Sequence, residues 1–121
     1  MKLCLIVDDS KVIRTIARRI LEGLNLKSKE ASNGSEALEI CKQAMPDAVL
    51  LDWNMPVMNG LEFLEALRKL EGGDSPIVVL CTTENDIKHI QAAIQAGANE
   101  YIMKPFDSEI LQAKFEQAGI L

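Results

Sequence analysis

The chain contains, near its N-terminus, the stretch Leu3-Cys4-Leu5-Ile6-Val7-Asp8-Asp9-Ser10, an apolar run that ends in two carboxylates. Apolar residues that follow one another without alternation are typical of a strand covered on both faces of a parallel sheet. Two other runs have the same character: Ala48-Val49-Leu50-Leu51 and Ile77-Val78-Val79-Leu80-Cys81. We expect these three runs to form the central strands of one sheet.

Weaker strands and segments of helical period complete the pattern. The stretches 27–31 and 101–103 are shorter or more polar and predict edge strands. The first strand is followed by an expected Ser10 N-cap and by an apolar stripe of Ile13, Ile16, Ala17, Ile20, Leu21 and Leu24. Similar stripes predict helices over residues 37–45 before Pro46, 61–67 before Gly72-Gly73, 87–94 before Gly97, and 110–115 after an Asp107 or Ser108 cap. This alternation predicts an α/β fold of five βα units with a parallel sheet.

The composition is that of one globular domain. The 121 residues are 48% hydrophobic and 26% charged, which suffices for one core. We therefore expect a single domain, residues 1–121, with no output domain after Leu121. No apolar run approaches the roughly 18 residues of a membrane span, and Asp8 interrupts the first run too early for a signal sequence. A cytoplasmic protein is expected, and the net charge of -5 disfavours nucleic acid as a partner.

The three cysteines, Cys4, Cys41 and Cys81, lie in apolar stretches and form no CxxC pair. Their spacing supports neither a zinc site nor a redox pair. We expect them to be buried free thiols.

Three aspartates follow predicted central strands: Asp8 and Asp9 the first, and Asp52 the third. In an open α/β sheet the ligand crevice lies outside the carboxyl ends of the strands, so adjacent first and third strands would bring these carboxylates together. Neighbouring carboxylates repel one another, and a bound cation removes the repulsion. Oxygen ligands alone favour Mg²⁺ over zinc. Taken singly, each aspartate has a simpler interpretation as a cap or turn residue.

Two further residues favour a phosphate site over that interpretation. Thr82 follows the fourth strand, and Lys104-Pro105 follows the fifth. A cation and a lysine can neutralise the oxygens of a phosphoryl group, and a hydroxyl can donate a hydrogen bond to one of them. In-line transfer to a carboxylate then needs mainly positioning and charge stabilisation.

Four motifs in this order resemble the response regulator receiver family. They are Val7-Asp8-Asp9-Ser10, Leu51-Asp52-Trp53-Asn54-Met55-Pro56 with Asn59-Gly60, Cys81-Thr82-Thr83-Glu84, and Tyr101-Ile102-Met103-Lys104-Pro105-Phe106. They span essentially the whole chain and are most similar to single-domain, chemotaxis-type (CheY-like) regulators. The resemblance implies a flavodoxin-like fold, (βα)5, with a five-stranded parallel sheet in the order 2-1-3-4-5 and helices on both faces.

The resemblance also implies a role for each site residue. Asp52 is the phosphoacceptor, and Asp9, Asp52 and the backbone carbonyl of Asn54 are direct magnesium ligands. Asp8 acts mainly through metal-bound water. Lys104 binds the phosphate and is followed by a cis bond to Pro105.

The implied switch consists of Thr82 and Tyr101. The Thr82 hydroxyl moves toward the new phosphate, and the Tyr101 ring turns into the space that opens. This movement reshapes the face formed by the fourth helix, fifth strand and fifth helix. The alternative for Tyr101 is an ordinary half-buried strand aromatic.

Three residues are expected to tune the access of water and phosphodonor: Asn54, Thr83 and Glu84. Thr83 departs from the family, in which Ala or Gly is usual, and its β-branched side chain narrows the opening or adds a hydroxyl.

Other polar and aromatic side chains are expected in simpler positions. His89 is expected on a solvated helix surface, and Trp53 is expected to be partly exposed beside the metal. A solvent-facing position is expected for Arg14, Arg18 and Arg19, with docking of a partner as the alternative.

The resemblance implies a phosphoprotein of a two-component system that is not an enzyme beyond its own phosphorylation and dephosphorylation. A histidine kinase is the expected phosphodonor, and a monomer is expected. The target is a flagellar motor switch protein or, in a phosphorelay, a histidine phosphotransfer protein; the sequence does not separate these two. A Mg²⁺-dependent phosphohydrolase of the haloacid dehalogenase type is disfavoured because Asn54 stands where its acid/base aspartate would be. A constitutive adaptor is disfavoured because the site residues are all present.

Overall fold

The computed structural model of the chain describes residues 2–82 and 87–121. Within these residues five strands form one parallel sheet in the order β2-β1-β3-β4-β5. Their bounds are β1 (Leu3–Val7), β2 (Lys27–Ala31), β3 (Ala48–Asp52), β4 (Ile77–Thr82) and β5 (Glu100–Met103). The predicted fold class, strand order and central strands are confirmed.

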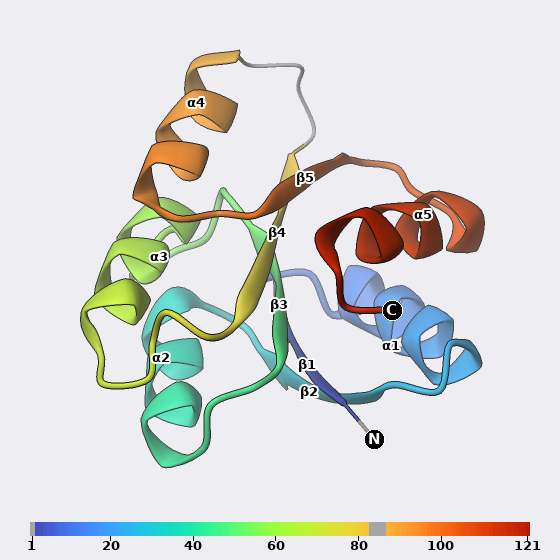
Figure 1. Cartoon of the computed structure of the whole chain (residues 1–121), viewed down its shortest axis with the longest axis horizontal. Coiled ribbons are helices and arrows are strands. Elements are labelled where there is room, and N and C mark those ends of the chain that lie inside the picture. The colour runs from blue at the N-terminus through green and yellow to red at the C-terminus, as the bar shows by residue number, and fades with distance from the viewer. Residues whose placement is uncertain (1, 83–86) are drawn as a thin grey trace.

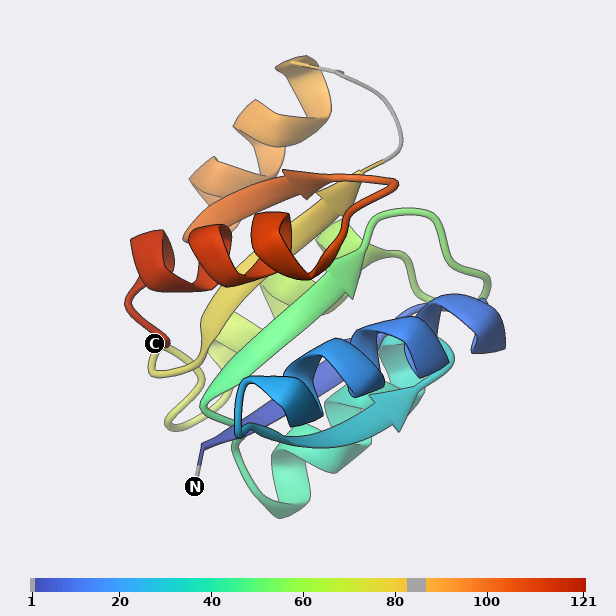
Figure 2. The same cartoon turned by 90° about the vertical axis from the view of Figure 1, so that its right-hand side faces the viewer.

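The helices cover both faces of the sheet. They are α1 (Lys11–Gly23), α2 (Gly34–Gln43), α3 (Gly60–Lys69), α4 (Ile87–Ala96) and α5 (Ser108–Ala118). Figure 1 shows the sheet nearly edge-on, with α2, α3 and α4 on one side and α1 and α5 on the other. Figure 2 looks onto the side that carries α1 and α5. The described residues include no helix long and apolar enough to cross a membrane.

Alternate side chains of the strands enter two separate hydrophobic cores, because successive residues of a strand point to opposite faces. From β1, Leu5 and Val7 pack with Phe63 of α3, whereas Cys4 and Ile6 pack with the α1 and α5 residues of the second core. Both cores are essentially inaccessible to solvent. This explains why the central strands are continuous apolar runs rather than alternating ones.

The cysteines are buried free thiols, as predicted. Burial raises the pKa of Cys41 to about 11 and that of Cys4 to about 12. They are therefore structural apolar residues, since a reactive thiol requires a lowered pKa.

The helix ends agree with the sequence in part. The Ser10 hydroxyl accepts a hydrogen bond from the Ile13 N–H, and Asp107 rather than Ser108 caps α5. Gly97, just after α4, has a φ of 112°, a conformation that glycine adopts without strain. The predicted end of α2 was too late, because the backbone is already extended at Ala44.

The apolar stripe of α1 is narrower than predicted. Ala17 and Leu21 are buried, but Ile16 is 43% exposed and Val12, on the same helix, is 68% exposed. Adjacent helix residues are about 100° apart, so Ile16 lies beside the buried stripe and not within it.

Candidate functional site

Three aspartates converge at the carboxyl edge of the central strands. Val7 of β1 is paired with Leu51 of β3, which places Asp8 beside Asp52. One carboxylate oxygen from each of Asp8, Asp9 and Asp52 lies within 4.8 Å of the others. Asp8 and Asp52 are buried, whereas Asp9 is exposed. The structure therefore brings the predicted acidic cluster together.

Lys104 reaches this cluster from the end of β5. Its Nζ donates to Asp8 Oδ2 at 2.6 Å and to Asp52 Oδ1 at 3.2 Å. The Lys104 N–H donates to the backbone oxygen of Thr82 at 2.8 Å, so the ends of β4 and β5 are held together. The Lys104–Pro105 peptide bond is cis, where the resemblance implied one.

The electrostatics of the site depend on burial and on this lysine. Burial raises the pKa of Asp52, and the carboxylates of Asp8 and Asp9 act in the same direction, while Lys104 partly opposes them. Burial disfavours the charged Lys104 ammonium, but hydrogen bonds and charges from Asp8 and Asp52 outweigh it and raise its pKa. The lysine is therefore charged at neutral pH and compensates part of the negative charge.

Asp8 is hydrogen-bonded at each of its polar groups. The Ser10 N–H donates to Asp8 Oδ1 at 2.9 Å, and the Asp8 N–H donates to the Ala31 oxygen at 3.1 Å. Lys104 binds the second carboxylate oxygen, and Arg14 Nη1 donates to the Asp8 carbonyl oxygen at 2.7 Å. The loop after β1 is consequently held from α1, β2 and β5.

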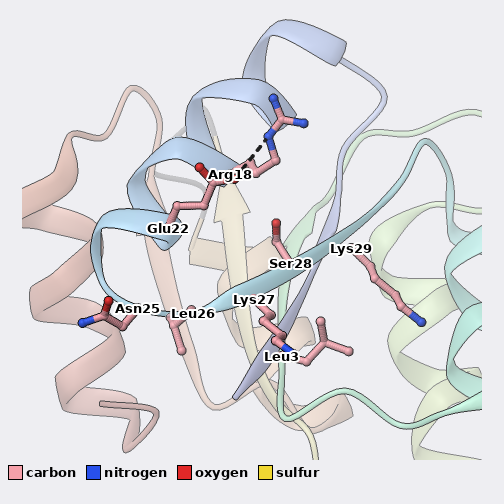
Figure 3. A pocket seen from close by; sticks show the side chains of 8 residues that line it. All are labelled: Leu3, Arg18, Glu22, Asn25, Leu26, Lys27, Ser28 and Lys29. Carbon is pink, nitrogen blue, oxygen red and sulfur yellow. Dashed lines mark ion pairs between the residues drawn. The ribbon is translucent and has the colours of Figure 1, made fainter. Parts of the chain in front are cut away.

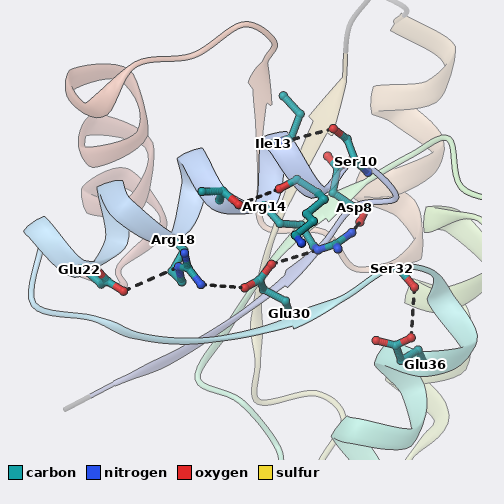
Figure 4. A network of polar contacts seen from close by, with 11 residues as sticks. Asp8, Ser10, Ile13, Arg14, Arg18, Glu22, Glu30, Ser32 and Glu36 are labelled. Atoms are coloured by element: carbon teal, nitrogen blue, oxygen red, sulfur yellow. Dashed lines mark hydrogen bonds and ion pairs between the residues drawn. The ribbon is translucent and has the colours of Figure 1, made fainter.

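Arg14 corrects the expectation that all three arginines of α1 face solvent. Its side chain is only 15% exposed, and Nε pairs with Glu30 of β2 at 3.0 Å (Figure 4). Arg18 is 42% exposed and pairs with Glu22 and Glu30, while Arg19 is exposed, as expected. The sequence signal that was missed is the acidic Glu30 in an edge strand next to an arginine pair at i, i+4 spacing.

The loop between β3 and α3 folds back tightly onto Asp52. The Gly60 N–H donates to the Trp53 oxygen at 2.9 Å, and a Cβ on Gly60 would lie only 2.4 Å from the Asp52 carbonyl oxygen. Glycine fits there because any side chain would force the loop or the backbone at Asp52 to shift. Asn54 is exposed in this loop, two residues after Asp52.

Trp53 and His89 form a stacked pair beside the site. Their ring centroids are 4.2 Å apart and their planes differ by 14°. Trp53 is half-buried, in line with the expectation. The prediction for His89 was wrong: the ring is half-buried against the loop that follows Asp52, because α4 approaches that loop closely.

The predicted switch residues lie in different surroundings. Thr82 is buried at the end of β4. Tyr101 is half-buried in β5, and Lys114 Nζ of α5 lies 4.6 Å from the centre of its ring. Thr83 and Glu84 lie outside the described residues.

The donor set of the acidic cluster fits a hard divalent cation. It consists of carboxylate oxygens only, two of them buried and one exposed, which leaves room for water and for a phosphate oxygen. Zinc is a poorer fit, since among the described residues neither a histidine nor a thiolate belongs to the cluster.

A cavity of about 540 Å³ lies elsewhere, where β1 and β2 begin. Figure 3 shows its lining, with the Arg18–Glu22 ion pair at its rim. Because β1 and β2 run toward the aspartates, the cavity is at the opposite edge of the sheet. It is not part of the acidic site.

Comparisons with known proteins agree with this geometry. Residues 4–116 match the family model described as the response regulator receiver domain. A chemotaxis protein CheY homolog of Campylobacter jejuni is 38% identical over 118 residues, which is 96% of this chain and 90% of that protein. The Vibrio cholerae chemotaxis protein CheY4 superposes with a TM-score of 0.93 at 32% identity, over 98% of each chain.

A further solved structure bears on the acidic cluster. The receiver domain of the sensor histidine kinase PA1611 from Pseudomonas aeruginosa has a magnesium ion coordinated in its active site cleft. It has a TM-score of 0.85 and 27% identity, over 93% of this chain and 92% of that one.

Proposed function

The chain belongs to the response regulator receiver family, and on this premise we propose that it is a cytoplasmic, monomeric single-domain phosphorylation switch of a two-component system. In this proposal Asp52 accepts a phosphoryl group from a histidine kinase in the presence of Mg²⁺. The observation that carries the proposal is the position of Lys104, which lies 3.2 Å from Asp52 Oδ1 and 2.6 Å from Asp8 Oδ2. A buried carboxylate, two further carboxylates and an ammonium thus meet at one point, as phosphoryl transfer requires.

Asp9, Asp52 and the backbone carbonyl of Asn54 would hold the Mg²⁺ directly, and Asp8 would hold it through water. When bound, the ion supplies positive charge that neutralises the carboxylates and phosphoryl oxygens. The arrangement of Asp8 supports the indirect role, because Ser10 and Lys104 already occupy its two carboxylate oxygens. Asp9 is exposed and available.

In the transfer step, a carboxylate oxygen of Asp52 attacks the phosphorus of the donor's phosphohistidine. A bond from this oxygen to phosphorus forms as the phosphorus–nitrogen bond breaks, and the electron pair of that bond goes to the leaving imidazole nitrogen. The product is an acyl phosphate on Asp52. The Lys104 ammonium leaves the Asp52 carboxylate and binds a phosphoryl oxygen instead, whose negative charge it neutralises. Hydrolysis by water later returns the carboxylate and inorganic phosphate, with Asn54, Thr83 and Glu84 tuning the access.

The output in this proposal is a changed surface formed by α4, β5 and α5. The Thr82 hydroxyl donates a hydrogen bond to the new phosphoryl group, and the Tyr101 ring turns into the space that the Thr82 side chain leaves. A buried Thr82 and a half-buried Tyr101 on neighbouring strands are compatible with such coupling. The named relatives support a chemotaxis target such as a flagellar motor switch protein, with transfer to a histidine phosphotransfer protein as the alternative.

Trp53 offers a direct test, since it follows Asp52 and stacks on His89. We expect its fluorescence to change when Mg²⁺ is added and again when beryllofluoride is added as a phosphoryl mimic. Asp52→Asn should abolish the second change. The folded wild type failing to respond to either addition would contradict the proposal.

A further inference from the structure

We propose that Arg14 is a positioning residue for the metal-binding aspartates. It fixes the peptide group between Asp8 and Asp9 and thereby strengthens Mg²⁺ binding. This inference rests on the proposed function, which supplies the Mg²⁺.

The contacts of Arg14 hold its guanidinium between two elements. Nη1 donates to the Asp8 carbonyl oxygen at 2.7 Å, and Nε donates to Glu30 Oε1 at 3.0 Å. The other oxygen of Glu30 lies 3.5 Å from Arg18 Nη1. Figure 4 shows this row of contacts running from the Asp8 loop along α1 to Glu22. Because the guanidinium is planar and is held at two edges, its orientation is defined.

The peptide that Arg14 holds is the one that orients Asp9. The Asp8 carbonyl lies in the same rigid plane as the nitrogen and Cα of Asp9. The Asp8 carboxylate is independently held by Ser10 and Lys104. By contrast, across residues 2–82 and 87–121 the exposed Asp9 carboxylate makes no hydrogen bond or ion pair with another residue. Its direction therefore depends on its backbone, and Arg14 supports that backbone.

Two effects of Arg14 on a cation oppose each other. Its positive charge repels Mg²⁺, whereas a fixed ligand favours binding. Glu30 is 3.0 Å away and compensates the charge, so the net field at the metal is small. The positioning effect should therefore decide the sign. Residues that orient metal ligands typically contribute 10- to 100-fold in affinity, and because Arg14 acts through the backbone we expect the lower end, roughly tenfold.

The test is a titration of the full chain with Mg²⁺. Calorimetry and Trp53 fluorescence measure the affinity. Arg14→Met keeps the apolar part of the side chain but removes every donor, and should weaken Mg²⁺ roughly tenfold. Arg14→Lys keeps the charge but cannot form the forked pair of bonds, and should weaken it about threefold. The matched control is Arg18→Met, which also removes a partner of Glu30 but leaves the Asp8 carbonyl bond intact; its affinity should stay within about twofold.

The direction of the change in Mg²⁺ affinity separates the positioning effect of Arg14 from the repulsion by its charge. Unchanged or tighter Mg²⁺ binding by Arg14→Met overturns the inference, as does equal weakening by the Arg14 and Arg18 variants. If thermal unfolding without metal shows that Arg14→Met is not folded, Arg14→Lys decides by the same criteria. A wild type that binds no Mg²⁺ would overturn the proposed function together with this inference. Wild-type binding that the Arg14 variants retain in full would overturn this inference alone.

Discussion

Replacing Asp52 by asparagine should stabilise the metal-free protein at neutral pH. The Asp52 residue is only 7% exposed, and burial raises the pKa of its carboxyl group. A carboxyl group whose pKa is higher in the folded than in the unfolded state reduces the stability of the fold. The reduction is complete at pH values above the folded-state pKa. Asparagine has a similar shape, carries no charge, and keeps an oxygen that can accept a hydrogen bond from Lys104.

The expected gain is about 2 kcal/mol, because the charges around Asp52 nearly cancel and burial remains. At an effective dielectric constant of about 20, the Lys104 contact at 3.2 Å is worth about 5 kcal/mol. Asp8, within 4.8 Å, opposes it by at least about 3.5 kcal/mol on the same scale. Asp9 is exposed and adds a smaller, screened repulsion. Desolvation of the buried group then leaves a cost of about 1–3 kcal/mol, or roughly 8 °C in melting temperature at the midpoint.

Urea unfolding with a chelator present measures this gain directly. The advantage of Asp52→Asn should be full above the raised pKa of Asp52 and should disappear as the pH falls through it, because the wild-type carboxyl group is then protonated in the fold. Saturating Mg²⁺ should narrow the difference by stabilising the wild type through mass action. Glu65→Gln, on the exposed surface of α3, is a matched change of charge and should have little effect.

The reasoning would be refuted by a metal-free Asp52→Asn variant that is less stable than the wild type at neutral pH. In that case the attraction between Lys104 and Asp52 exceeds the cost of burial. A gain that is independent of pH would also contradict it, since the charge of Asp52 would not be its source.

Three other substitutions have defined expectations. Gly60→Ala should lower the free energy of unfolding by about 1–3 kcal/mol and weaken beryllofluoride binding, because the added Cβ meets the Asp52 carbonyl. Urea unfolding and a fluorescence titration measure these two effects. Stability and affinity equal to those of the wild type would mean that the loop can shift to accept the Cβ. Val57→Asn should raise the free energy of unfolding by about 1 kcal/mol, since Val57 is 82% exposed with a φ of 70°, which asparagine tolerates better; a loss of stability in urea would contradict the backbone strain. His89→Ala should cost about 1 kcal/mol and shift the Trp53 emission to the red as its ring gains water, and an unchanged spectrum would argue against the stack.

The fold was predictable because its strands are buried on both faces. A run such as Leu3–Val7 has no solvent-facing side, so its sequence distinguishes a central parallel strand from an antiparallel one. The aspartates were predictable as a cluster for a related reason: the carboxyl ends of adjacent parallel strands meet at one edge. The pairing of β1 with β3, however, was implied by the resemblance and not by the periodicity.

The errors concern side chains whose surroundings are set by a distant element. Arg14 was expected in solvent because a cluster of basic residues on a helix usually forms a solvated face, yet its partners lie in β2 and in the loop after β1. His89 was placed on a polar surface because nothing at helical spacing contacts it, yet it meets Trp53 across the sheet edge. Helical periodicity describes one helix and contains no information about which other elements pack against the sides of its apolar face.

The hydrogen bond between Lys104 and Asp8 joins residues 96 positions apart. Such a contact closes most of the chain into one loop, so it forms only when the intervening strands have been ordered. During synthesis, Asp8 and Asp9, which follow β1, leave the ribosome long before Lys104 is added. A nascent or prematurely terminated chain that lacks β5 therefore has acidic residues but no assembled phosphoryl site. Under the proposed function, such an unfinished chain would therefore neither accept phosphoryl groups nor compete with the complete protein for the phosphodonor.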